Sequence, residues 1–131
     1  MKTYAFRLNP GDDLKKELLK SVREKKVKAG CILTCVGSLN GVNVRVADGK
    51  TEQSFEGQYE IVSLVGTLEE GDAHLHISFS DLEGNVFGGH LKEGCLIHTT
   101  AEIVVGIVEN VIFKREFDNS TGYDELKITK K

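Results

Sequence analysis

The segment that most constrains the fold is a four-residue turn between two short apolar runs. Residues 81–84 read Asp-Leu-Glu-Gly. Asp is favoured at the first position of a type I turn, and glycine readily adopts the left-handed conformation that closes a three-residue hairpin loop. The flanking residues are therefore predicted to form two antiparallel strands in which Asp81 faces Asn85. Every other residue pair of the hairpin follows from this register.

This register brings together three of the four histidines of the chain. His76 lies directly opposite His90, and His74 becomes a diagonal neighbour of His90. Because side chains alternate along a strand, all three imidazoles share one face. The other face carries an apolar set that is expected to point into the core: Leu75, Ile77, Phe79, Phe87 and Leu91.

Three imidazoles on one face are suited to binding a transition metal. Histidine has an ordinary pKa of about 6.5, and neutral imidazole is a good ligand for zinc and related ions. We therefore predict a metal site, most simply zinc, formed by His74, His76 and His90. Three protein ligands leave one zinc position open for water, substrate or a carboxylate. The alternative for the same residues is a hydrogen-bonded polar surface buried at a subunit contact.

Glu102 is a further candidate for the site. By alternation it shares a face with His98 and Thr100. If that face adjoins the histidines, Glu102 would act as a metal ligand, as a hydrogen-bond partner of a ligand, or as a general base. The alternative is a solvent-facing glutamate. His98 lies outside the hairpin and is predicted to be an ordinary polar residue.

The rest of the pattern predicts a single α+β domain over residues 1–131. An amphipathic helix is expected over 13–26, with an apolar stripe opposite a lysine-rich face. A turn is expected at Asn40-Gly41. Strands are predicted over residues 2–8, 29–36, 42–47, 51–56, 59–68, 73–80, 85–91, 99–114 and 125–129. One helix with seven or more strands indicates a largely antiparallel sheet.

Composition argues against several classes of protein. The formal net charge of −3 gives no sign of the basic surface that DNA-binding domains usually carry. Three cysteines are an odd number, and Cys31 and Cys35 lie about 13 Å apart on one predicted strand, too far for a disulfide. No apolar run reaches membrane-spanning length, and no signal-peptide pattern begins the chain. We therefore expect a cytoplasmic protein with reduced thiols and no membrane contact.

Ordered motifs run along nearly the whole chain. They are Arg7 with residues 10–14 (Pro-Gly-Asp-Asp-Leu), 37–39 (Gly-Ser-Leu), 57–62 (Gly-Gln-Tyr-Glu-Ile-Val), 64–67 (Leu-Val-Gly-Thr), 74–78 (His-Leu-His-Ile-Ser), Asp81, Gly84, 88–91 (Gly-Gly-His-Leu), 100–102 (Thr-Ala-Glu) and 121–126 (Thr-Gly-Tyr-Asp-Glu-Leu). Together these motifs resemble the PPC (plant and prokaryote conserved) domain family.

The resemblance implies an α/β fold built on an antiparallel sheet and assembled as a homotrimer. It also implies that His74, His76 and His90, which match the family's His-x-His and Gly-Gly-His, hold a metal in some prokaryotic members. In plant members an AT-hook enters the DNA minor groove, and a Gly-Arg-Phe-Glu-Ile-Leu stretch contacts transcription factors. This chain has no AT-hook, and Gln58 stands where that stretch has arginine.

Two functions follow as expectations. The first is a stand-alone, homotrimeric, metal-binding PPC-domain protein with a DNA-binding or regulatory role, acting through DNA or a protein partner. The second is a metal-dependent enzyme that acts on a small substrate at the three-histidine site, with Glu102 as base. A cupin-like barrel also carries His-x-His on a strand, but the predicted helix and the full-length resemblance count against it.

Overall fold

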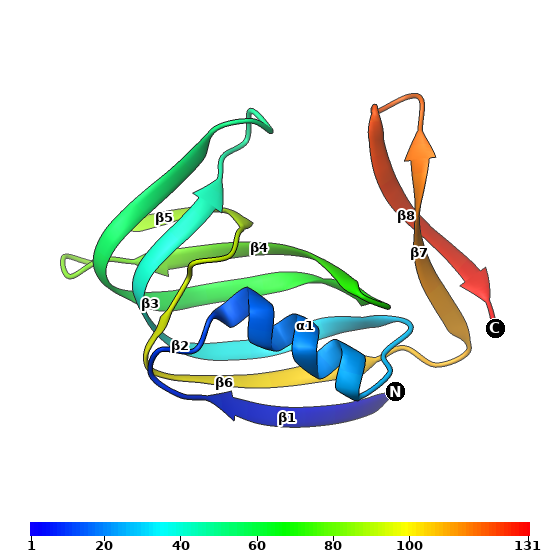
Figure 1. The fold of residues 1–131 in the computed structure, drawn as a ribbon, viewed down its shortest axis with the longest axis horizontal. Coiled ribbons are helices and arrows are strands. Elements are labelled where there is room, and N and C mark those ends of the chain that lie inside the picture. The colour runs from blue at the N-terminus through cyan, green and yellow to red at the C-terminus, as the bar shows by residue number, and fades with distance from the viewer.

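The structure consists of a curled antiparallel sheet, one helix packed on it and a separate C-terminal hairpin (Figure 1). This computed structural model describes all of residues 1–131. Its elements are β1 (Lys2–Leu8), α1 (Leu14–Glu24), β2 (Gly30–Arg45), β3 (Glu52–Glu69), β4 (Asp72–Ser80), β5 (Val86–Leu91), β6 (Ile97–Ile107), β7 (Val111–Asp118) and β8 (Tyr123–Lys130). The sheet order is β1-β6-β2-β3-β4-β5, and β7 pairs only with β8. The predicted α+β fold with a largely antiparallel sheet is confirmed.

The sheet curls until β2 meets β5. Near the end of β2, Val44 pairs with Leu91 and Arg45 pairs with His90. Strands β2, β3, β4 and β5 therefore form a closed ring. Gly89 permits this approach, because a Cβ at that position would lie 2.8 Å from the carbonyl oxygen of Arg45. We call the two β2–β5 residue pairs the seam.

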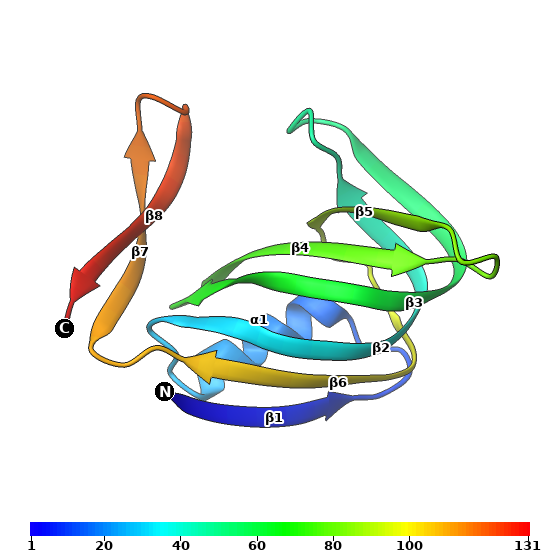
Figure 2. The same ribbon diagram turned by 180° about the vertical axis from the view of Figure 1, so that it is seen from behind.

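A bend in β2 and β3 makes the closure possible. The predicted turn at Asn40-Gly41 is wrong, because β2 runs through it without ending. Gly41 has a φ of +91°, and the β2–β3 register shifts between Asn40 and Val42. The left-handed glycine thus forms a β-bulge, which bends a strand and increases its twist. Both strands turn away from the rest of the sheet at this level (Figure 2).

The long strand predicted over residues 99–114 is divided in two. Asn110 adopts a positive φ of 68° between β6 and β7, and the chain leaves the sheet there. Strand β6 stays between β1 and β2, whereas β7 and β8 stand to one side of the ring in both ribbon views (Figures 1 and 2). The run of Val and Ile gave no sign of this break, because both strands are rich in these residues.

The core is formed by the inner face of the sheet and by α1. Asp13 caps the helix by accepting a hydrogen bond from the Lys16 amide at 3.1 Å. The buried helix residues are Leu14, Leu18 and Val22. At the other end of the core, Phe79 is fully buried and packs against Phe55, Tyr59 and Phe87, with ring centroids 5.1–6.1 Å from its own. No helix in the structure has the length and apolarity needed to cross a membrane.

Candidate metal centre

The β4–β5 hairpin has the register that the sequence predicts. Asp81 and Asn85 face each other, with the Asp81 amide donating to the Asn85 carbonyl oxygen at 2.9 Å. The Asp81 carboxylate accepts hydrogen bonds from the amides of Glu83 and Asn85, and Gly84 adopts a φ of 83°. His76 accordingly lies opposite His90. The local chemistry of one turn thus determines which side chains meet several residues away.

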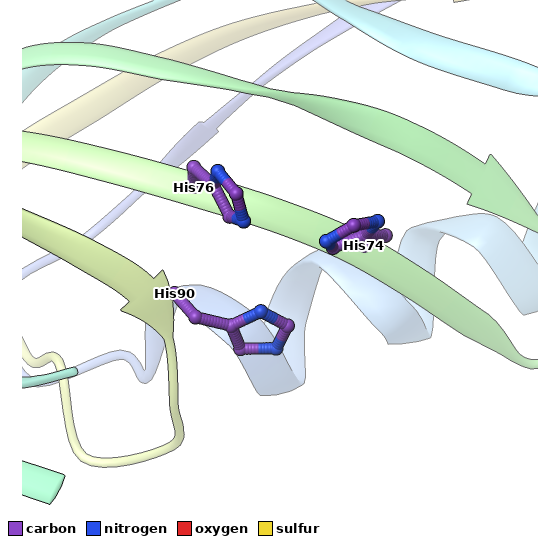
Figure 3. A group of neighbouring side chains, drawn as sticks. All are labelled: His74, His76 and His90. Atoms are coloured by element: carbon purple, nitrogen blue, oxygen red, sulfur yellow. The ribbon is translucent and has the colours of Figure 1, made fainter. Parts of the chain in front are cut away.

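The three histidines point toward one another from two paired strands (Figure 3). One ring nitrogen from each lies within 4.8 Å of those of the other two. The ring centroids are 5.0–5.6 Å apart. A tetrahedral zinc ion with Zn–N bonds of about 2.1 Å requires nitrogens about 3.4 Å apart, so rotations about side-chain bonds would bring the three into coordination distance.

The surroundings of His74 and His90 favour the neutral form of the imidazole. Burial, together with the positive charge of Arg45, lowers the pKa of His90 to about 4. Burial and the neighbouring His76 also lower the pKa of His74. A neutral imidazole offers a lone pair to a metal, whereas an imidazolium does not. In addition, Nδ1 of His90 is buried without a hydrogen-bond partner in the protein, so the residues present fit a bound cation.

Glu102 is not brought to the histidines. It lies in β6, opposite Arg7 of β1 and Val36 of β2. Strands β2 and β3 separate β6 from β4 in the sheet, and three strand spacings amount to about 14 Å. Within one chain, Glu102 is therefore not among the groups whose ligand atoms lie close to those of the three histidines. His98 is the second residue of the same strand.

Arg45 is the site residue that the sequence did not reveal. Because it pairs with His90 across the seam, its side chain lies on the histidine face. Its Nε is buried and has no hydrogen-bond partner in the protein. Arg45, His74 and His90 line a cavity of about 410 Å³. Only the pairing of β2 with β5 could have indicated this neighbour, and no local pattern reports that pairing.

The β7–β8 hairpin forms the opposite wall of this cavity, with Arg115, Tyr123, Asp124 and Glu125. Arg115 fixes the hairpin in place, since its Nε donates to Glu69 at 2.8 Å and its guanidinium also donates to Thr67 at 3.2 Å. Glu69 is the one buried charged residue of the chain. The cavity therefore lies between the histidine hairpin and the β7–β8 hairpin, which Arg115 bonds to β3.

Comparison with known proteins places the chain in a family. The model of the Plants and Prokaryotes Conserved (PCC) domain matches residues 1–109. A segment of the bifunctional protein GlmU from Synechococcus sp. (strain JA-3-3Ab) is 42% identical over 130 residues, covering 99% of this chain and 21% of that protein. AT-hook motif nuclear-localized protein 2 from Arabidopsis thaliana is 28% identical over 112 residues, covering 79% of this chain and 33% of that protein. The chain thus spans about a fifth to a third of the length of these relatives.

Solved structures show the same fold. A hypothetical protein from Salmonella enterica matches with a TM-score of 0.97 and 38% identity, covering 99% of this chain and 94% of its own. A metal-containing protein from Archaeoglobus fulgidus matches with a TM-score of 0.75 and 24% identity, covering 97% and 94%. The predicted resemblance is confirmed, and the chain belongs to the plant and prokaryote conserved domain family.

Proposed function

We propose that this chain is a metal-binding domain whose His74, His76 and His90 hold a zinc ion. The observation that carries the proposal is the approach of three imidazole nitrogens to within 4.8 Å of one another. The lowered pKa values of His74 and His90 and the unpartnered Nδ1 of His90 support it. The Archaeoglobus protein of the same fold is described as metal-containing, which agrees with a site of this kind.

The test is elemental analysis of the purified protein after incubation with zinc and removal of the excess. We expect about one ion per chain, with the three histidines as its protein ligands. His76→Ala should lose most of the ion, because two imidazoles hold zinc weakly. The matched control is His98→Ala, which removes the fourth histidine without touching the site and should keep the ion. Metal-free wild-type protein, or equal loss in both variants, would contradict the proposal.

The domain is further proposed to act as a homotrimer. Its support in this chain is a group of large apolar side chains on β2 and β3 that are 48–56% exposed: Leu33, Val36, Val62 and Val65. Gathered apolar surface of this kind is typical of protein contacts. Val62→Asp should dissociate the trimer in light-scattering measurements, whereas Leu82→Asp, at an 82% exposed turn position, should leave it intact. A monomeric wild-type protein would refute this part.

The proposed biological role is regulation through a protein or DNA partner, in the cytoplasm. The plant relatives combine this domain with an AT-hook motif, as their name states. Residues 1–131 contain no AT-hook pattern and carry a net charge of −3. A mobility shift that weakens with salt would indicate DNA as the partner, since phosphate contacts release counterions.

The second candidate function is a metal-dependent enzyme acting on a small substrate. It is favoured by the cavity of about 410 Å³ that adjoins His74 and His90. When bound, zinc supplies Lewis-acid activation and lowers the pKa of a bound water. The carboxylates that line the cavity are Asp72, Asp124 and Glu125. These residues replace Glu102 as candidates for holding a proton near the histidines.

A further inference from the structure

The cavity beside the histidines contains an arginine without a partner. Arg45 forms none of the ion pairs of the structure, although Glu52 of β3 is its neighbour across the strand pair. Its Nε is nevertheless buried. Guanidinium groups only donate hydrogen bonds, and a buried charged donor without an acceptor is unfavourable. A ligand that satisfies the donors of Arg45 must therefore be a hydrogen-bond acceptor.

The charges around the cavity favour an anion as that acceptor. The ionisable side chains in its lining, other than histidine, are three cations and three carboxylates: Lys15, Arg45, Arg115, Asp72, Asp124 and Glu125. Arg115 is already bonded to Glu69. A divalent ion on the histidines would leave the whole cavity net positive. A positive, partly enclosed site concentrates anions.

The size of the cavity limits the anion to a small molecule. Ligand pockets commonly range from about 300 to 1,000 Å³, and this cavity of about 410 Å³ is near the lower end. Three protein ligands leave one position of a zinc ion free. Arg45 lies directly across from His90, one of these three, and both side chains line this cavity.

We propose that this cavity binds a small oxyanion, a carboxylate or a phosphate, between the metal and Arg45. One oxygen takes the free metal position, and another accepts a hydrogen bond from Arg45. Paired oxygens match the planar donors of guanidinium, which makes arginine a selective partner for these groups. The inference rests on the proposed metal function and adds the chemical class of the ligand.

The test uses cobalt in place of zinc, because the visible spectrum of protein-bound cobalt changes when a ligand enters its coordination shell. Cobalt-loaded protein is titrated with lactate, with inorganic phosphate and with lactamide, the uncharged counterpart of lactate. We expect a saturable spectral change with lactate or phosphate and none with lactamide. The stronger of the two anions identifies the ligand as a carboxylate or a phosphate.

Variants of Arg45 then test its role. Arg45→Met should weaken anion binding about ten- to a hundredfold, the usual range for losing a charged hydrogen bond, while cobalt content stays unchanged. Arg45→Lys keeps the positive charge but loses the planar donors, so its affinity for the anion should lie between those of the wild type and Arg45→Met. The control is Lys16→Met, which removes an exposed cation that pairs with Glu93 outside the cavity and should bind the anion normally.

The outcomes separate this inference from the function on which it rests. Protein that binds cobalt but shows no response to either anion, an equal response to lactamide, or unchanged binding in both Arg45 variants overturns the inference alone. Protein that takes up no cobalt contradicts the metal function. In that case, calorimetric titration of the metal-free protein tests whether the cavity binds an anion without a metal. Anion binding that is lost in the Arg45 variants would support an anion site at Arg45, and the absence of anion binding would refute it.

Discussion

The sheet with its helix and the β7–β8 hairpin contribute to the molecule in different ways. All 23 residues of the apolar core lie between Leu8 and Val105, and the hairpin supplies none. Large side chains of the hairpin such as Phe117 and Ile128 remain about 60% exposed. The family match likewise ends at residue 109, before β7 begins. The sheet thus provides stability and the histidines, whereas the hairpin provides one wall of the cavity.

The largest difference between the two regions is expected from one substitution made in each. Phe79→Ala should lower the free energy of unfolding by about 3–5 kcal/mol, because it leaves a cavity among packed aromatic rings. Phe117→Ala should change it by about 0.5 kcal/mol or less, because the side chain is 60% exposed. Denaturant unfolding measures both. A cost at Phe117 close to that at Phe79 would show that the hairpin is buried in the native assembly.

The link between the regions should be the next most sensitive point. Arg115→Ala leaves the carboxylate of Glu69 buried without its partner, and breaking a buried pair in this way costs about 3 kcal/mol. Lys127→Ala is the matched control, because its pair with Glu116 lies within the hairpin with both side chains more than half exposed. Such exposed pairs contribute about 0.5 kcal/mol or less. Equal stability of the two variants would mean that the hairpin is held by other contacts.

The reactivity of the three thiols is expected to show a smaller effect, which reports on the contact between the hairpin and the sheet. Burial raises the pKa of Cys35 to about 12 and that of Cys95 to about 11, and for Cys95 burial outweighs the lowering effect of the Asn43 backbone hydrogen bond. Both should resist iodoacetamide at pH 8.5. Cys31 is partly exposed and pairs with Thr67, which bonds to Arg115. Arg115→Ala should therefore speed the labelling of Cys31 a few-fold and leave the other two cysteines unchanged.

The same shifts predict how alkaline pH acts on the sheet. Unfolded cysteines lose their protons near pH 9, whereas the folded thiols keep them until about pH 11–12. Ionisation therefore stabilises only the unfolded chain in this interval, and the free energy of unfolding falls as the pH rises above about 9. Melting curves of wild type and Cys35→Ala between pH 8 and 10.5 test the sign, since the variant should show a shallower decline. An equally steep decline of the melting temperature in both proteins would show that groups other than Cys35 cause the loss of stability.

The sequence predicted that the three histidines lie together, but it did not predict that Arg45 lies beside them. The turn at Asp81–Gly84 fixes the pairing of neighbouring strands, so the grouping of the histidines could be read from the chain. Arg45 meets His90 only through the bulge at Gly41 and the closure of the ring, and a left-handed glycine has the same sequence signal in a bulge as in a turn. For Glu102, the alternation of side chains predicted which face of its strand it lies on. It could not predict the order of the strands in the sheet, and that order determines the distance of Glu102 from the histidines.

The seam also orders the events of folding. Its two residue pairs join segments far apart in the chain, so they carry a larger loop-closure entropy than the hairpins beside them and should form after those hairpins. The histidine cluster can assemble early from β4 and β5 alone, whereas Arg45 arrives only when the ring closes. A ligand that contacts both the histidines and Arg45 would bind only the closed ring and would stabilise it by mass action. Ligand binding at this site would therefore report the completion of folding.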